Sequence, residues 1–254
     1  MGSVKKSKVT TAFVLDFETG GLDCQKCGVT QLSMHAVRLD NFNVMDTMNI
    51  YFAPYAYREL EKPTKKKLKT KYEVNDVQMM LYEERAFEIT GITMDLLESR
   101  GLDLTSACEQ IIEFIKKNSF DTAASCKPFL VGQNVAFDIG FLTQIFLYTG
   151  LYQNLSKLLR GHKDYFGNWH PLYVDTIPLS QLALGHEEVD SWTLGSLSER
   201  MGIDLDNAHD ADADVEATRE ILRVLTSKMR SGDSDGGGAL EKTKKTKTRE
   251  HFKI

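Results

Sequence analysis

The chain has 254 residues, of which 42% are hydrophobic and 26% are charged, and its formal net charge is −5. This composition is ordinary for a soluble globular protein, and the length is enough for one large domain or two small ones with a core of normal size. The excess of 36 acidic over 31 basic residues does not by itself indicate nucleic-acid binding, although metals and local basic patches can carry that attraction.

The first eight residues, Met1 to Lys8, have no apolar run after their lysines, and no stretch of the sequence is apolar enough to span a bilayer. We therefore expect a flexible N-terminus over residues 1–8 and a cytoplasmic protein. The four cysteines fit that expectation as reduced thiols. Cys24 and Cys27 form one Cys-x-x-Cys pair, but Cys108 and Cys126 do not form a second, so the pattern does not favour a zinc or redox site.

The first part of the chain predicts three strands joined by short loops, and hence an antiparallel meander over residues 9–18, 29–39 and 44–52. The pattern then breaks at a basic insertion over about residues 55–73. Seven basic and two acidic residues lie between Arg58 and Lys71. The insertion is either a solvated loop or surface helix, or a flap that contacts phosphates.

The second part of the chain predicts helices alternating with short strands. Thr93 and Thr193 are expected to cap helices that end before Gly101 and Gly202. Further helices are predicted over 105–117, 138–148 and 210–229, and further strands over 129–131 and 172–174. Residues 231–254 are rich in glycine and then basic, which is typical of a disordered tail. Strands followed by alternating helices and strands predict an α/β domain with a mixed sheet.

Asp16 and Glu18 end the first predicted strand, directly after an apolar run. Residues two apart in a strand point to the same face, so both carboxylates share a face while Phe17 points into the opposite layer. Like charges side by side repel unless a cation lies between them, and an all-oxygen pair suits Mg²⁺ or Mn²⁺. The alternative is a solvent-facing strand end whose acids have no role.

Two later stretches hold further acids. Asp138 follows the polar turn after the strand 129–131 and stands at the start of an apolar helix, where the helix dipole favours a carboxylate. The stretch from Asn207 to Asp214 places a histidine and three acids at the start of the last helix. Asp210 and Asp214 are four apart and share a face, while Asp212 points elsewhere. Taken alone, each stretch is also consistent with an ordinary acidic helix N-terminus.

Together the three stretches resemble the DEDD family of 3′→5′ exonucleases, which includes the proofreading subunits of bacterial replicases and related RNA-trimming enzymes. The Asp-x-Glu motif of the family is matched by Asp16 and Glu18, and its Asn-x-x-Phe-Asp turn by Asn134, Phe137 and Asp138. The His-x-x-x-x-Asp motif of the histidine subtype is matched by His209 and Asp214; the tyrosine subtype would have Tyr at position 210. Two departures are Gly20-Gly21-Leu22 in place of Thr-Gly-Leu, and Thr90 in place of His before Gly91-Ile92-Thr93.

The resemblance covers about residues 9–228, and it implies a ribonuclease H-like fold in which a mixed five-stranded sheet is flanked by helices, with residues 9–230 as the exonuclease domain. It also implies two Mg²⁺ or Mn²⁺ ions, which clamp the attacking and leaving oxygens of a phosphoryl displacement. The implied metal ligands are Asp16, Glu18, Asp138 and Asp214, and the implied general base is His209. The implied contacts to the substrate come from Thr19, Leu22, Asn134 and Phe137.

The predicted activity is a metal-dependent 3′→5′ exonuclease that releases nucleoside 5′-monophosphates, from DNA more than from RNA, as in proofreading or repair. The alternatives are an RNA-trimming exoribonuclease, a noncatalytic nucleic-acid-binding or polymerase-accessory protein on the same scaffold, and an α/β protein whose acids are incidental. The predicted partners are the 3′ end of a single strand and, through the tail 231–254, a separate DNA polymerase.

Overall fold

The computed structural model describes residues 10–59, 78–120, 126–185, 189, 191–205 and 209–231. The predicted flexible N-terminus, most of the predicted basic insertion and all of the predicted tail after Ser231 lie outside the described residues. The insertion begins in described chain, where Tyr55 is buried and its backbone carbonyl accepts a hydrogen bond from the Met80 N–H at 3.0 Å. The positions from 55 to 57 are therefore part of the packed domain.

The predicted mixed five-stranded sheet is confirmed. Its strands are β1 (Thr11–Thr19), β2 (Val29–Arg38), β3 (Val44–Tyr51), β4 (Phe129–Gly132) and β7 (Tyr173–Asp175), in the order β3-β2-β1-β4-β7. The first three strands pair antiparallel, and β4 pairs parallel with both β1 and β7. The strand β1 is therefore central, and this arrangement is of the ribonuclease H-like type.

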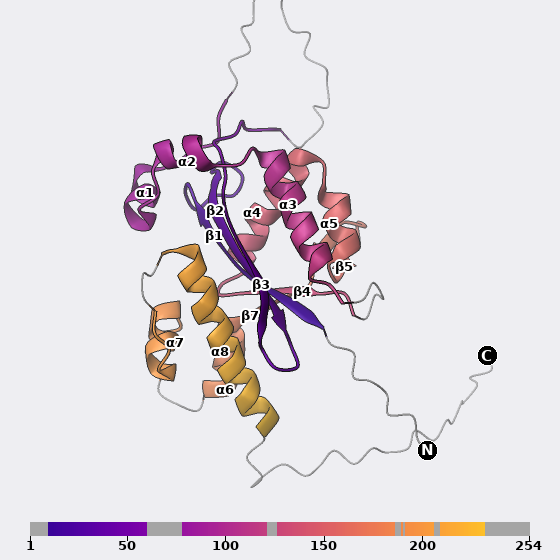
Figure 1. The fold of residues 1–254 in the computed structure, drawn as a ribbon, viewed down its shortest axis with the longest axis vertical. Coiled ribbons are helices and arrows are strands. Elements are labelled where there is room, and N and C mark those ends of the chain that lie inside the picture. The colour runs from indigo at the N-terminus through magenta and orange to yellow at the C-terminus, as the bar shows by residue number, and fades with distance from the viewer. Residues whose placement is uncertain are drawn as a thin grey trace, which may run out of the picture.

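Two layers of helices cover the sheet (Figure 1). The helices α3 (Leu104–Lys117), α4 (Ala136–Thr149) and α5 (Tyr152–Leu158) lie on one face, and α6 (Thr176–Leu184), α7 (Leu194–Met201) and α8 (Ala211–Ser231) lie on the other. The alternation of β1 explains both layers. Phe13, Leu15 and Phe17 belong to the core shared with α3, α4 and α5, whereas Ala12 and Val14 pack with residues of α8.

The sequence pattern did not predict several short elements. These are α1 (Glu84–Thr90), α5, α6, and a separate hairpin of β5 (Gly161–Lys163) and β6 (Trp169–Pro171). The predicted caps are confirmed: Thr93 accepts the Leu96 N–H at the start of α2 (Met94–Arg100), and Thr193 accepts the Ser196 N–H at the start of α7. No helix among the described residues has the length and apolar character that crossing a membrane requires.

Candidate metal centre

The carboxyl end of β1 holds the first two acidic side chains. Asp16 and Glu18 are both partly exposed, whereas Phe17 between them is buried against Phe52 with ring centroids 6.4 Å apart. The predicted separation of the two carboxylates from Phe17 is confirmed. The pairing of β1 with β2 shifts register between Glu18 and Thr19, an irregularity of the kind that turns side chains at the end of a strand.

The first turn of α8 supplies the third carboxylate. Asp210 precedes the helix, where its Oδ1 accepts the Asp212 N–H at 3.1 Å and its carbonyl accepts the Asp214 N–H at 3.0 Å. Asp210 is therefore the cap of α8. It also acts on the site electrostatically, because its charge raises the pKa of Glu18 and Asp214.

Asp16, Glu18 and Asp214 come together in one cluster, in which one carboxylate oxygen from each lies within 4.8 Å of the others. Burial, followed by the charge of Asp214, raises the pKa of Asp16 to about 7. Burial and the charges of Asp16, Asp214 and Asp210 raise the pKa of Glu18 to about 8. Asp16 and Glu18 are thus crowded enough to hold protons near neutral pH when no cation separates them from each other and from Asp214.

A divalent cation fits this cluster. The donor set consists only of carboxylate oxygens, which suit hard cations such as Mg²⁺ and Mn²⁺. In addition, the buried Oδ1 atom of Asp214 has no hydrogen-bond partner among the described residues. A buried, unpaired carboxylate oxygen is costly in an apolar interior, and coordination of a metal would remove that cost.

Asp138 lies beside the cluster, in the first turn of α4. The helix begins at Ala136, two residues before the predicted start, and no side chain caps it. The Oδ1 atom of Asp138 accepts the backbone N–H of Phe17 at 2.9 Å, so the carboxylate is bonded to β1 between Asp16 and Glu18. Burial, followed by the charge of Asp16, raises its pKa well above the ordinary value. Asp138 is therefore more than a helix-terminal acid.

His209 lies at the entrance to α8, where its side chain is exposed. Its backbone has a φ of 71°, in the left-handed region that a non-glycine residue seldom adopts. Burial raises the pKa of Asp214, and the backbone N–H and the charge of His209 partly offset that rise. The histidine is therefore an exposed group next to the third carboxylate.

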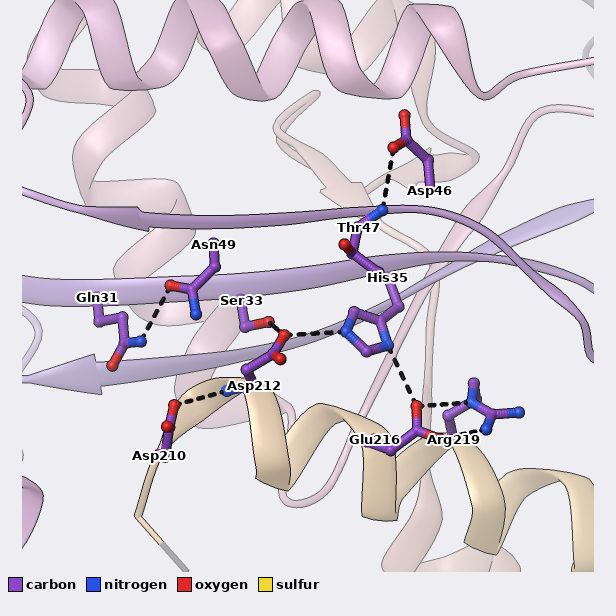
Figure 2. A network of polar contacts seen from close by, with 10 residues as sticks. All are labelled: Gln31, Ser33, His35, Asp46, Thr47, Asn49, Asp210, Asp212, Glu216 and Arg219. Carbon is purple, nitrogen blue, oxygen red and sulfur yellow. Dashed lines mark hydrogen bonds and ion pairs between the residues drawn. The ribbon is translucent and has the colours of Figure 1, made fainter. Parts of the chain in front are cut away.

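Polar contacts join α8 to β2, the strand next to β1 (Figure 2). Asp212 turns away from the cluster, as predicted, and its Oδ1 accepts the Ser33 hydroxyl at 2.8 Å and lies 3.1 Å from His35 Nε2. One turn later, Glu216 Oε2 lies 3.6 Å from Nδ1 of the same buried ring. His35 therefore lies between two carboxylates of α8, and these two residues flank Asp214 in the sequence.

Ser33, His35 and Asp212 did not emerge as site residues from the sequence. The signal that could have found them is the polar alternation of Gln31, Ser33 and His35 within a strand that is buried throughout its length except at Arg38. Polar side chains at every second position of a buried strand require partners on the covering layer. Asp212 and Glu216 of α8 provide them for Ser33 and His35, whereas the side-chain amide of Gln31 donates to Asn49 of β3 at 3.0 Å.

The four predicted substrate contacts lie at the ends of β1 and β4. Thr19 is buried and donates its hydroxyl to the Gly21 carbonyl at 2.8 Å, whereas Leu22 is 84% exposed. Asn134 is exposed in the left-handed region with a φ of 54°, and its N–H bonds to Asp175 Oδ1 at 3.1 Å. Phe137 is partly exposed and packs on the Phe141 ring, with centroids 5.0 Å apart.

The cysteines take no part in the cluster. Cys24, Cys27 and Cys108 are free thiols, and neither residue of the Cys-x-x-Cys pair belongs to the group of metal-ligating side chains found among the described residues. Burial raises the pKa of both Cys24 and Cys27, so their thiol forms are favoured over the thiolates that bind zinc.

The fold is similar to that of solved exonuclease I structures. The Escherichia coli enzyme in complex with a dT13 oligonucleotide has a TM-score of 0.59 and 21% identity, over 87% of this chain and 42% of that chain. Its zinc-bound form with single-stranded DNA has a TM-score of 0.58, 22% identity, and coverage of 87% and 41%. Exonuclease I from Methylocaldum szegediense has a TM-score of 0.56, 23% identity, and the same coverage. The chain thus spans less than half the length of these proteins, and no family model matches it.

Proposed function

We propose that this chain is a metal-dependent 3′→5′ exonuclease of the DEDD type, histidine subtype, which releases nucleoside 5′-monophosphates from single-stranded 3′ ends. The observation that carries the proposal is the convergence of Asp16, Glu18 and Asp214, from two distant segments, on one point with an unpaired buried oxygen. The likeness in fold to exonuclease I supports this proposal, and the oligonucleotide bound to that enzyme favours DNA as the substrate.

Asp16, Glu18 and Asp214 would hold one Mg²⁺ or Mn²⁺. Asp16 and Asp138 would hold a second ion. When bound, such a pair of ions stabilises the charge that develops on the attacking and leaving oxygens. The chain itself contributes the fixed separation of the carboxylates, set by the Phe17 N–H to Asp138 bond and by the cap of α8.

His209 would take a proton from the attacking water on an imidazole nitrogen. A histidine suits this role because its ordinary pKa lies near neutral pH. The exposed position of His209 next to Asp214 leaves the ring accessible to substrate and solvent. Leu22 and Phe137 would contact the terminal base, while Thr19 and Asn134 would shape the turns on which the terminal nucleotide rests.

The test is a digestion time course on 5′-labelled single-stranded DNA and RNA of one sequence, with Mg²⁺, Mn²⁺ or chelator. We expect a metal-dependent ladder that shortens from the 3′ end, faster on DNA, and no ladder from Asp214→Ala. Glu220→Ala is the matched control, because that carboxylate lies on the same helix but pairs with Arg219 and Arg223.

Intact substrate in every lane, from protein shown to be folded, would contradict the nuclease proposal. That result would favour the accessory-protein alternative, in which the basic residues after Ser231 bind a polymerase or a nucleic acid. A faster RNA ladder would instead retain the nuclease and reassign the substrate to RNA.

A further inference from the structure

The β5–β6 hairpin presents two aromatic side chains to solvent. Tyr165 is 96% exposed and Phe166 is 84% exposed, and both lie in the turn between the strands. Their rings meet edge to face, with centroids 5.5 Å apart and an interplanar angle of 85°. Adjacent exposed aromatic residues do not contribute to a core, and such patches commonly mark interaction sites.

The turn that carries these rings is built to be rigid. Asp164 accepts the Asn168 N–H at 2.8 Å and the Asn168 side-chain amide at 3.1 Å, and it lies 3.2 Å from a ring nitrogen of His170. Gly167 has a φ of 85°, a conformation that side chains other than glycine seldom adopt. The exposure of the two rings is therefore imposed by the turn.

The hairpin is also anchored to the helical layer that carries Asp138. The Tyr152 hydroxyl of α5 donates to the Trp169 carbonyl at 2.7 Å, and the two rings pack with centroids 5.6 Å apart. A cavity of about 570 Å³ separates the hairpin from α4 and is lined on the helix by Ile139, Thr143 and Leu147. This stripe of α4 begins one residue after Asp138 and extends along the helix for about 12 Å.

The charges next to the rings are mainly basic or neutral. Lys163 precedes the turn and lines the cavity, and His162 and His170 pair across the hairpin with ring centroids 5.6 Å apart. The one acid of the turn, Asp164, is engaged by Asn168 and His170. Exposed aromatic rings beside a lysine are the combination that binds unpaired bases and their phosphates.

We propose that the β5–β6 hairpin is a stacking platform for unpaired bases of the substrate strand, upstream of the 3′ nucleotide held at the metal centre. The proposal rests on the proposed function, and α4 provides the continuity, because the stripe of Ile139, Thr143 and Leu147 that lines the cavity begins one residue after Asp138. Single-stranded nucleic acid is the occupant, since the two rings offer flat faces that any base can stack on.

The test measures equilibrium binding by fluorescence anisotropy in chelator, where no turnover occurs. Two labelled oligothymidylates are compared, one of about 4 and one of about 15 nucleotides, so that only the longer one spans the metal centre and the hairpin. The variants are the doubles Tyr165→Ala/Phe166→Ala, Tyr165→Leu/Phe166→Leu and Tyr165→Phe/Phe166→Tyr. Leu182→Ala on α6 is the matched control, because that side chain is also apolar and 82% exposed.

We expect the alanine and leucine doubles to weaken binding of the long strand by about fivefold to a hundredfold, the usual effect of losing a stacked aromatic residue. The Phe/Tyr exchange, the control variant and all measurements on the short strand should match the wild type. Unchanged long-strand affinity in the alanine double would overturn the proposal. Retained affinity in the leucine double would equally overturn stacking, since it would indicate a general apolar surface for a protein segment.

The hairpin and the nuclease proposal fail in different ways. Cleavage of the short strand at wild-type rate by the alanine double, together with unchanged long-strand binding, would remove only the hairpin proposal. Absence of metal-dependent cleavage in the wild type would remove the nuclease, while the anisotropy results would still report whether the rings bind a single strand.

Discussion

Asp16, Glu18 and Asp214 repel one another until protons or a cation intervene, and this repulsion makes the stability of the metal-free protein depend on pH. The pKa of Asp16 is raised to about 7 and that of Glu18 to about 8, from values of about 4 in the unfolded chain. The folded protein therefore holds protons that the unfolded chain has already released. This contribution to stability is complete below about pH 4 and is lost as the pH rises through about 7 to 8.

We accordingly expect the Tm in chelator to fall as the pH rises from about 5 to about 8 and to level off above about 8, where both groups are ionised in the folded and in the unfolded chain. Added Mg²⁺ should raise the Tm most at the upper end of that range, where the carboxylates bind it without first losing protons. Differential scanning calorimetry at matched ionic strength checks both trends. Asp214→Asn should weaken the fall of the Tm with pH in chelator. An equal rise in Tm on adding Mg²⁺ at both ends of the pH range would contradict the assignment of this fall to the acidic cluster.

His209 and the carboxylates should respond differently to mutation. His209→Ala should lower kcat by about 10²- to 10⁴-fold, the usual contribution of a general base, while the rise in Tm on adding Mg²⁺ remains. Asp16→Ala should abolish turnover and most of that rise together. If His209→Ala also lost the Mg²⁺ effect, the histidine would belong with the metal ligands.

At the scale of elements, α8 is held over β2 by Asp212, and Asp214 depends on that contact for its position. Asp212→Ala would leave the Ser33 hydroxyl and the buried His35 ring without their partner, so we expect the free energy of unfolding to fall by about 1–3 kcal/mol. The Mg²⁺ concentration for half-maximal activity should also rise. Asp212→Asn retains an acceptor oxygen, so it should lower the free energy of unfolding less and raise the required Mg²⁺ concentration less. Urea denaturation measures the first quantity, and titration of activity with Mg²⁺ measures the second.

If Asp212→Ala lowered stability but left the metal requirement unchanged, the contact would only hold the helix. If it changed neither, the side chain would have other partners in solution.

The strands of the sheet were predictable from local patterns, such as the apolar run before Asp16. The cluster of Asp16, Glu18 and Asp214 was expected from the resemblance to the DEDD family, because its members come from distant segments that no local pattern joins. The role of His35 was not predictable in the same way, since its partners Asp212 and Glu216 are distant in sequence. The β5–β6 hairpin was missed because each strand is three residues long, too short for a period to be seen.

At the scale of the whole molecule, the sheet separates two helical layers, and the proposed metal centre draws on both. Asp138 comes from α4 on one side and Asp214 from α8 on the other, while β1 lies between them with Asp16 and Glu18. All the residues of the cluster and of the β2–α8 contact lie between Asp16 and Arg219.

A chain truncated after Ser231 should therefore fold and cleave short oligonucleotides at the wild-type rate. The measurement is kcat on a short 5′-labelled strand for both lengths of chain, with circular dichroism as the folding control. Weaker binding of long strands or of a polymerase by the truncated chain would assign a role to residues 232–254. Inactivity of a folded truncated chain would show that the tail contributes to the site.

The order in which the carboxylates occur along the chain has a consequence for biosynthesis. Asp16, Glu18 and Asp138 leave the ribosome well before α8, because chains are synthesised and begin to fold from the N-terminus. A nascent chain that has completed the sheet as far as β7 still lacks Asp214 and the polar contact of α8 with β2. The last carboxylate of the cluster thus arrives with the last described helix, so a polypeptide whose translation stops early contains a nearly complete scaffold without a complete acidic cluster.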